Sequence, residues 1–298
     1  MRLTLLACLV LTACAAAQGP DTTRAAKFDG ARAFKDLTEI VAIGPRPAGS
    51  EGAQKTRDYI KQQLKAIDVQ AVEQSFDQET PAGTVHMVNV SATLPGSGQG
   101  RLVIAGHYDT KLFKEFAFVG ANDAGSSTAF LLELARALKG RTNAVPIELL
   151  FLDGEEAVGE WSTGNTFGSR HYVDVAVKAG TARQIKALIL VDMIGDRQLV
   201  IKRESNSTPW LKDAIWSAAK RLNRPEFVSD STPIEDDHLP FLAAGIDSVD
   251  LIDLDYPDAT MRYWHTADDT LDKTAAASLQ AVGDVVLAAL PAIELRIK

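Results

Sequence analysis

Continuous apolar runs alternate with stretches of helical period along most of the chain. The runs Arg101–Ala105, Ile147–Leu152 and Ala187–Val191 show no polar alternation, which is typical of strands buried on both faces. The predicted helices are Ala31–Ile43, Ala53–Ile67, Asp123–Leu138, Pro209–Leu222, Asp237–Gly245 and Thr270–Ile297. This alternation predicts one α/β domain with a twisted, mixed, mostly parallel central sheet flanked by helices.

The remaining predicted strands are more polar. Val69–Phe76 and Thr84–Leu94 resemble a hairpin, which makes the sheet mixed, and Gln198–Lys202 is expected at a sheet edge. Ser248–Leu254 is a strand with interspersed acids. The C-terminal helix is expected to be amphipathic, with a break near Pro291.

The N-terminus has the pattern of an export signal. Arg2 precedes the apolar stretch Leu3–Ala13, and we expect a signal peptide at 1–17, a polar tether at 18–30 and the catalytic domain at 31–298. Two endings of the signal remain open. Leu11–Cys14 resembles a bacterial lipobox, which would leave a lipid anchor at Cys14, whereas Ala15–Ala17 offers an ordinary cleavage site.

An exported protein is therefore predicted: a periplasmic or outer-membrane lipoprotein, or a secreted protein, on the assumption of a bacterial source. Both cysteines, Cys8 and Cys14, lie inside the signal, so the mature chain has no disulfide, thiolate ligand or cysteine nucleophile. The net charge of −8 without a basic patch argues against a nucleic-acid partner. No apolar run approaches the roughly 18–20 residues of a transmembrane span.

Acids and histidines follow the buried strands. His107 comes after the first run, Glu155 and Glu156 after the second, and Asp192 after the third. Because the carboxyl ends of parallel strands face one crevice, these side chains are expected to converge. Oxygen and nitrogen ligands without thiolates suit a catalytic zinc.

Asp123 and His265 extend this set. Asp123 is either a helix cap or a metal ligand, and the small residues around it favour a ligand. His265, between Trp264 and Thr266, completes an Asp, Glu, His triad with an open fourth position. One carboxylate of the Glu155–Glu156 pair can bind metal while the other serves as general base. Asp192 is either metal-bound or hydrogen-bonded in the site, because an unpaired buried acid is costly.

The motifs GHYDT, GANDAGSS, DGEE, VDMIG and WHTADDT, in this order, resemble the zinc-dependent aminopeptidase superfamily. For a dinuclear member the resemblance implies Glu155 as base. It implies the metal ligands His107, Asp123, Glu156, Asp192 and His265.

Three further features resemble the animal-type glutaminyl-peptide cyclotransferases. They are Trp161 with an insert before Phe167, the segment Ile234–Phe241, and Trp264 directly before His265. This resemblance implies one zinc held by Asp123, Glu156 and His265. It also implies Glu155 as proton shuttle and a buried acid network of Asp192 and Asp236. Trp161, Ile234 and Trp264 would line the pocket for a glutamine side chain.

The expected reaction is conversion of the N-terminal glutamine of a peptide or protein to pyroglutamate with release of ammonia. The alternative is a zinc aminopeptidase, in which His107 and Asp192 bind a second metal. Two departures from the animal enzymes affect the rim of the pocket. Asp250 stands where they have a histidine, and the loop Tyr256–Tyr263 is longer than theirs. His238 is expected to be structural, and His86 and His171 carry no motif.

Overall fold

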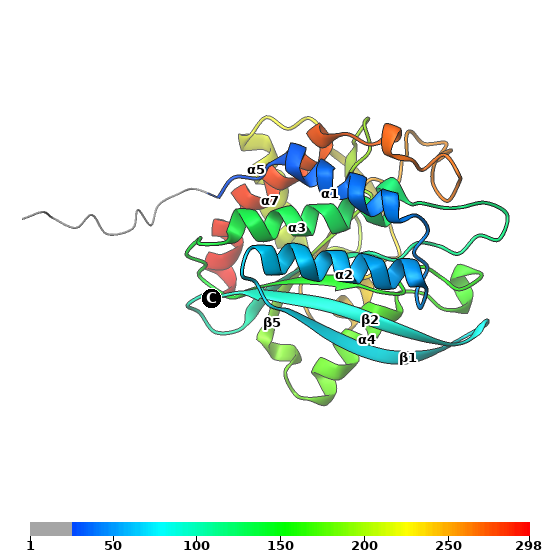
Figure 1. The fold of residues 1–298 in the computed structure, drawn as a ribbon. Helices are drawn as coiled ribbons and strands as arrows, with labels where there is room; N and C mark the ends of the chain where they lie inside the picture. Colours follow the sequence, from blue (N-terminus) through cyan, green and yellow to red (C-terminus); the bar gives the residue numbers. More distant parts are fainter. Residues whose placement is uncertain (1–25) are drawn as a thin grey trace, which may run out of the picture.

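A computed structural model describes residues 26–298, which form a three-layer α/β fold (Figure 1). The central sheet has six strands in the order β1-β2-β4-β3-β5-β8. Its strands are β1 (Ala71–Thr80), β2 (Gly83–Leu94), β3 (Arg101–His107), β4 (Ile147–Leu152), β5 (Ile185–Asp192) and β8 (Ser248–Ile252). The pairs β4–β3, β3–β5 and β5–β8 are parallel, while β1–β2 and β2–β4 are antiparallel. The mixed, mostly parallel sheet is confirmed.

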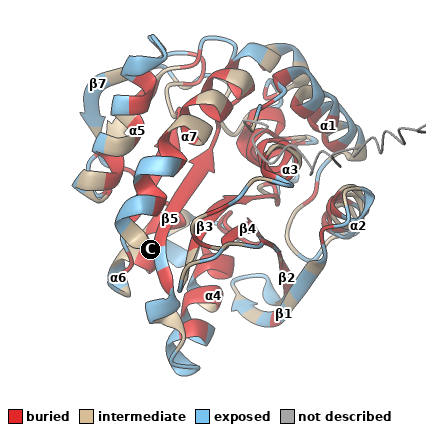
Figure 2. Cartoon of the chain, turned by 90° about the vertical axis from the view of Figure 1, so that its left-hand side faces the viewer, coloured by how far each residue is buried: buried red, intermediate tan, exposed pale blue. Residues whose placement is uncertain are grey.

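Helices cover both faces of this sheet. They are α1 (Gly30–Ile43), α2 (Glu51–Ala66), α3 (Ser127–Leu138), α4 (Phe167–Lys178), α5 (Pro209–Arg221), α6 (His238–Ala243) and α7 (Ala276–Ile297). One face carries α1, α2, α3, α5 and α7, and the other carries α4 and α6 (Figure 2). Successive side chains of β3 point to opposite faces of the sheet. Ile104 packs in the core on the face that carries α3, and Ala105 packs in the core on the face that carries α4. This two-sided burial explains the continuous apolar runs.

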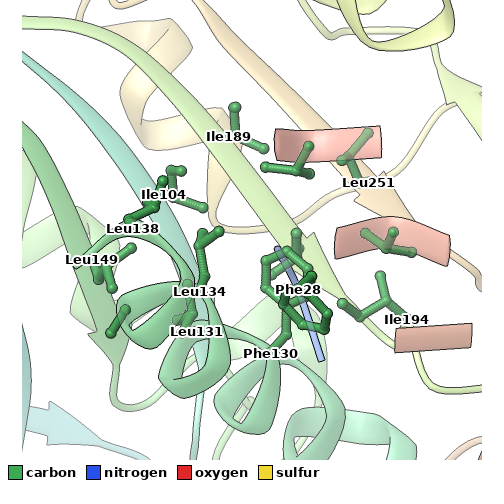
Figure 3. Packing of buried hydrophobic residues seen from close by; sticks show 14 of the residues in the cluster. Phe28, Ile104, Phe130, Leu131, Leu134, Leu138, Leu149, Ile189, Ile194 and Leu251 are labelled. Carbon is green, nitrogen blue, oxygen red and sulfur yellow. The ribbon is translucent and has the colours of Figure 1, made fainter. Parts of the chain in front are cut away.

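The larger hydrophobic core lies between the sheet and α3. Leu131 and Leu134 of α3 pack near Ile104 and Leu149 of the sheet (Figure 3). Phe28 joins this core, with its ring stacked on Phe130 at 5.1 Å between centroids. The prediction of a polar tether is therefore wrong at its described end, because Phe28 is only 5% exposed. The predicted signal and lipobox lie outside the described residues.

Two predicted helices are shorter than expected. The Asp123–Leu138 helix is divided into a π-helical turn, Ala121–Ser126, and α3, because Asp123 adopts non-helical angles (φ −91°, ψ 93°). The last helix begins at Ala276, after Thr274 bridges to Asp196. It continues through Pro291, so the predicted break is wrong. By length and composition α7 could span a membrane, but here it is a core helix.

The strand predicted at Gln198–Lys202 is also displaced. It runs from Ile201 to Glu204 as β6 and pairs with β7 (Phe227–Thr232) in a separate two-stranded sheet. It is therefore not an edge of the central sheet. The predicted elements include neither β7 nor α4.

Candidate metal centre and substrate pocket

The predicted ligands meet at the carboxyl ends of the parallel strands. His107 is the last residue of β3 and Asp192 the last of β5. Glu155 and Glu156 lie in the turn after β4, and Asp123 lies in the π-helical turn before α3. His265 comes from a loop more than 100 residues further along the chain than Glu156. Five segments thus contribute to one site, as the parallel topology predicts.

Two groups of three side chains have the spacing of metal ligands. Asp123, Glu156 and His265 form one, and His107, Asp123 and Asp192 form the other, with all ligand atoms of a group within 4.8 Å of each other. In the first, Nε2 of His265 lies 3.0 Å from Oε1 of Glu156 and 3.2 Å from Oδ2 of Asp123. In the second, Nε2 of His107 lies 3.1 Å from Oδ1 of Asp192. Asp123 belongs to both groups.

The first group fits a zinc ion. Its donors are two carboxylates and one imidazole, which zinc binds in catalytic sites. Oε2 of Glu156 is buried and has no hydrogen-bond partner among the described residues, so it can accept a cation. Burial alone would lower the pKa of His265, but hydrogen bonds to Asp123 and Glu156 raise it to about 9. Since a ligand must be the neutral imidazole, a bound cation would replace this proton.

Two further aspartates hold the backbone of the ligand loops. Asp109 accepts hydrogen bonds from the backbone N–H groups of Glu155 at 3.2 Å and Glu156 at 3.3 Å. Asp269 accepts from the N–H groups of Asn122 at 2.8 Å and Asp123 at 3.1 Å. Both carboxylates are fully buried. They fix the loop geometry behind the ligands, a role that the sequence analysis did not assign.

Glu155 lies beside the two groups without belonging to either. Its Oε2 is 3.9 Å from Nδ1 of His107, and the residue is 7% exposed at the floor of a pocket. Burial raises the pKa of Glu155 well above its ordinary value, and the neighbouring carboxylates of Glu156 and Asp236 add to this while His107 opposes it. A carboxyl group with a raised pKa, open to a pocket, is suited to accept and return a proton.

The pocket has a volume of about 430 Å³. The three residues predicted to form its wall lie beside the predicted metal ligands in it. Trp161, Ile234 and Trp264 all line it, together with Asp123, Glu155, Glu156, Asp192, Asp236 and His265. The indole of Trp161 donates to Oε2 of Glu235 at 2.8 Å, and the ring of Trp264 stacks on that of His265 with centroids 4.1 Å apart. Lys111 also lines the pocket, with Nζ 3.6 Å from Oε2 of Glu156. Lys111 is not among the predicted site residues.

Buried acids extend from the pocket into the protein. Burial and the carboxylate of Asp192 raise the pKa of Asp236 well above its ordinary value. Asp250, where the animal enzymes have a histidine, is fully buried, and burial with Asp236 raises its pKa similarly. His238 lies between Glu204, at 3.3 Å from Nε2, and Asp250, at 3.7 Å from Nδ1. His238 is thus a buried partner of this network.

The loop Tyr256–Tyr263, which is longer than in the animal enzymes, starts with a buried residue. Tyr256 is fully buried, and its hydroxyl donates to Oδ1 of Asp269 at 2.8 Å. The loop is thereby connected to the aspartate that holds Asp123. His265 follows it with a positive φ of 54°, a conformation that few residues other than glycine adopt.

Arg46 is a buried cation behind the site. It is completely inaccessible to solvent, and its guanidinium donates to the carbonyl oxygens of Tyr108, Val119 and Gly120. It thereby ties the segment after β3 to the turn that carries Asp123. Arg46 is not among the residues predicted to belong to the site.

Comparisons with known proteins agree with this site. Residues 89–290 match the model of peptidase family M28. The mouse (Mus musculus) glutaminyl-peptide cyclotransferase-like protein is 32% identical over 256 residues, which cover 76% of this chain and 66% of that protein. The glutaminyl-peptide cyclotransferase of Drosophila melanogaster is 30% identical, and the match covers 76% of this chain and 70% of that protein.

A solved structure is similar over nearly the whole chain. The glutaminyl cyclase of an Acidobacteriales bacterium superposes with a TM-score of 0.86 at 40% identity, covering 94% of this chain and 100% of that one. The chain spans 66% of the mouse relative's own length. The chain therefore belongs to peptidase family M28 and, within it, to the glutaminyl-peptide cyclotransferase family.

Proposed function

We propose that this protein is a zinc-dependent glutaminyl-peptide cyclotransferase that converts N-terminal glutamine to pyroglutamate and releases ammonia. The observation that carries the proposal is the pocket itself. Trp161, Ile234 and Trp264 surround Glu155 and the Asp123, Glu156, His265 group in one cavity of about 430 Å³. This volume lies within the range of pockets that bind small ligands.

In this proposal one zinc ion is held by Asp123, Glu156 and His265. When bound, it would supply a Lewis acid for the γ-carboxamide oxygen of the substrate. His107, Asp109 and Asp269 act behind the ligands and keep their geometry. Asp192 and Asp236 form the buried acid network beside Glu155, and Asp250 and His238 continue it inward.

Glu155 moves the proton that the reaction requires. The α-nitrogen of the substrate attacks the γ-carbonyl carbon, so one carbon–nitrogen bond forms while the bond to the side-chain nitrogen breaks. Glu155 takes a proton from the α-nitrogen and gives it to the departing nitrogen, which leaves as ammonia. Because nucleophile and electrophile belong to one residue, no second reactant has to be brought into place, and the indole walls contribute mainly to binding that residue.

An aminopeptidase is the second candidate, and one observation favours it. The group of His107, Asp123 and Asp192 also has ligand spacing, so a second metal would find donors there. A dinuclear site would activate water for hydrolysis of the first peptide bond. The two candidates therefore differ in metal content as well as in product.

A paired assay on the purified protein tests the proposal. One peptide begins with glutamine and the other with leucine, and both are followed by mass spectrometry while zinc per chain is counted by elemental analysis. We expect the first peptide to lose the mass of one ammonia, the second to remain intact, and one zinc per chain. Release of free leucine or glutamine with two zinc ions would establish the aminopeptidase instead.

We also propose that the protein is exported through a signal at 1–17, as a periplasmic or outer-membrane lipoprotein with a lipid on Cys14 or as a secreted protein. Its substrates would then be exported peptides and proteins with N-terminal glutamine. The support is the charged and apolar pattern of the first residues. Mass spectrometry of the mature N-terminus checks this: a diacylglyceryl cysteine supports the anchor, and a start after Ala17 supports ordinary cleavage.

A further inference from the structure

A second hollow adjoins the pocket on the other side of Trp161. It has a volume of about 520 Å³. It is lined by Gln78, Trp161, Ser162, Thr163, Gly164, Asn165, Phe167, Arg170, His171, Asp174 and Glu235. Trp161 and Glu235 line both cavities, and the indole N–H of Trp161 donates to the Glu235 carboxylate between them. We call this second hollow the outer groove.

The partition between the two cavities is the insert that precedes Phe167. The insert is attached to the catalytic turn, because Thr166 N donates to the carbonyl of Glu155 and Phe167 N to that of Gly154, both at 2.8 Å. Its 3₁₀ turn, Trp161–Thr163, presents one side to the pocket and the other to the outer groove. By resemblance, ordinary aminopeptidases have fewer residues here, so the groove is built by the same segment that distinguishes the cyclotransferases.

Arg170 of α4 provides a fixed positive charge in the outer groove. Its Nε donates to Thr166 Oγ1 at 2.9 Å and to the Asn165 carbonyl at 3.1 Å. Its Nη2 donates to Asn165 Oδ1 at 3.4 Å. All of these acceptors are uncharged, and no carboxylate of the described residues lies within 4.0 Å of the guanidinium, although Asp174 and Glu235 also line the groove. It remains exposed and can form a bidentate pair with a carboxylate.

The neighbouring residues suit an extended peptide. The imidazole of His171 stacks on Phe76 with 4.1 Å between centroids, and burial lowers its pKa, so the ring is a flat, neutral platform. Gln78 lies at the end of the groove on β1 and can exchange hydrogen bonds with a peptide backbone. The groove is thus polar, with an aromatic platform, a guanidinium that has no direct ion pair, and two carboxylates, Asp174 and Glu235, of which Glu235 already accepts from the indole of Trp161.

We propose that the outer groove binds the second to fourth residues of the peptide substrate and favours a carboxylate side chain opposite Arg170. This inference rests on the proposed function, since the first residue must occupy the inner pocket. A peptide whose glutamine lies beside Glu155 continues past the Trp161–Glu235 partition, and the groove begins at that partition. The enzyme would therefore select among N-terminal glutamine peptides by the residues that follow.

Charge reversal tests the proposal. The substrates are Gln-Gly-Glu-Ala and Gln-Gly-Lys-Ala amides, together with glutamine amides of a single small amine that cannot reach the groove. For the natural protein we expect kcat/KM to be about five-fold higher for the Glu peptide than for the Lys peptide, the size of an exposed ion pair. In Arg170→Glu the ratio of the two kcat/KM values should reverse. The ratio is taken within one variant, so a general loss of activity through the lost contact with Thr166, which the short substrate measures, cancels.

Lys178→Glu is the matched control, because Lys178 is exposed on the same helix but does not line the groove. It makes the same change in net charge and should keep the natural preference. Equal rates for both peptides in the natural protein and in Arg170→Glu would overturn the groove proposal. Absence of pyroglutamate from every substrate, including the short one, would instead overturn the proposed function.

Discussion

The pocket that contains Glu155 has an inner part around the predicted metal ligands and an outer part formed by its wall, which is distinct from the outer groove. These two parts are built in different ways. The inner part consists of side chains at strand ends and of backbone turns clamped by buried aspartates, such as Asp109 and Asp269. The outer part consists of three irregular segments, which carry Trp161, Ile234 and Trp264. The first arrangement attaches the proposed metal donors and proton carrier to rigid elements. The second gives a wall that can vary without disturbing them.

This difference explains how one family can support hydrolysis and cyclisation. Metal donors at strand ends suit either reaction, and here they even form two overlapping groups around Asp123. In the proposed function, the wall selects which substrate atoms reach them. Variants of the inner part should therefore change chemistry or zinc content, whereas variants of the outer part should change substrate binding.

Glu155→Gln should have the largest effect on catalysis. The amide cannot accept the proton from the α-nitrogen, so kcat should fall by about 1,000-fold, while zinc content stays at the natural level. Ammonia release and elemental analysis measure the two quantities. Glu160→Gln is the control, because Glu160 lines the same pocket but is exposed. A Glu155→Gln enzyme that retains its activity would assign the proton transfer to another group.

Two histidine variants separate the overlapping metal groups. Because His265 belongs only to the first group, His265→Ala should weaken zinc binding by at least about 100-fold, whereas His107→Ala should retain one zinc per chain. Zinc is counted after dialysis against a weak chelator. If each variant loses one of two zinc ions, the site is dinuclear and the distinction between ligands and supporting residues must be redrawn.

Glu204→Gln should destabilise the fold and, with it, the outer wall. The buried Glu204 carboxylate accepts from the N–H groups of Ser207 at 2.6 Å and Ile234 at 3.2 Å. Burial alone would raise the pKa of Glu204, but the interaction with His238 and the N–H donors lower it from 4.5 to about 2. Neutralising a buried, hydrogen-bonded charge should reduce the free energy of unfolding by about 3 kcal/mol, measured by urea denaturation at pH 7.

The pH dependence sharpens this test. Because the pKa is lower in the folded state, the carboxylate stabilises the protein fully above pH 4.5, and this contribution is lost as the pH falls toward 2. The difference between the natural protein and Glu204→Gln should shrink over that range. Glu73→Gln, which removes an exposed ion pair with Lys61, should cost under about 1 kcal/mol at any pH. A Glu204 variant as stable as the Glu73 variant would contradict this account.

Most of the inner site could be predicted from the sequence, because strands buried on both faces leave continuous apolar runs. His107 and Asp192 end such runs, and β4 has the predicted bounds. The supporting aspartates were not assigned, because their roles depend on tertiary closure. Asp269 accepts a hydrogen bond from the backbone of Asn122, a residue 147 positions away.

The missed elements lie in the outer parts of the fold. β7 has no apolar alternation, since Ser229, Asp230 and Ser231 are exposed, and it pairs only with β6. The sequence of α4 does contain a helical pattern, because Tyr172, Val173 and Ala176 have helical spacing and are buried. The helix was not predicted, because Phe167 was used only as the end of the insert and no element was assigned to the residues after it.

Trp161→Ala should have the smallest of these effects and should act on binding alone. The indole forms one wall of the pocket and donates to Glu235, so its removal should raise KM about 10-fold with little change in kcat and none in zinc content. Trp210→Ala is a matched control, because its indole N–H also donates to a carboxylate, Asp247, at 2.8 Å, but it does not line this pocket. Loss of zinc or a large fall in kcat in Trp161→Ala would show that the wall also holds the catalytic turn, through Thr166 and the carbonyl of Glu155. The inner and outer parts would then act as one unit, and the wall could not vary independently of the chemistry.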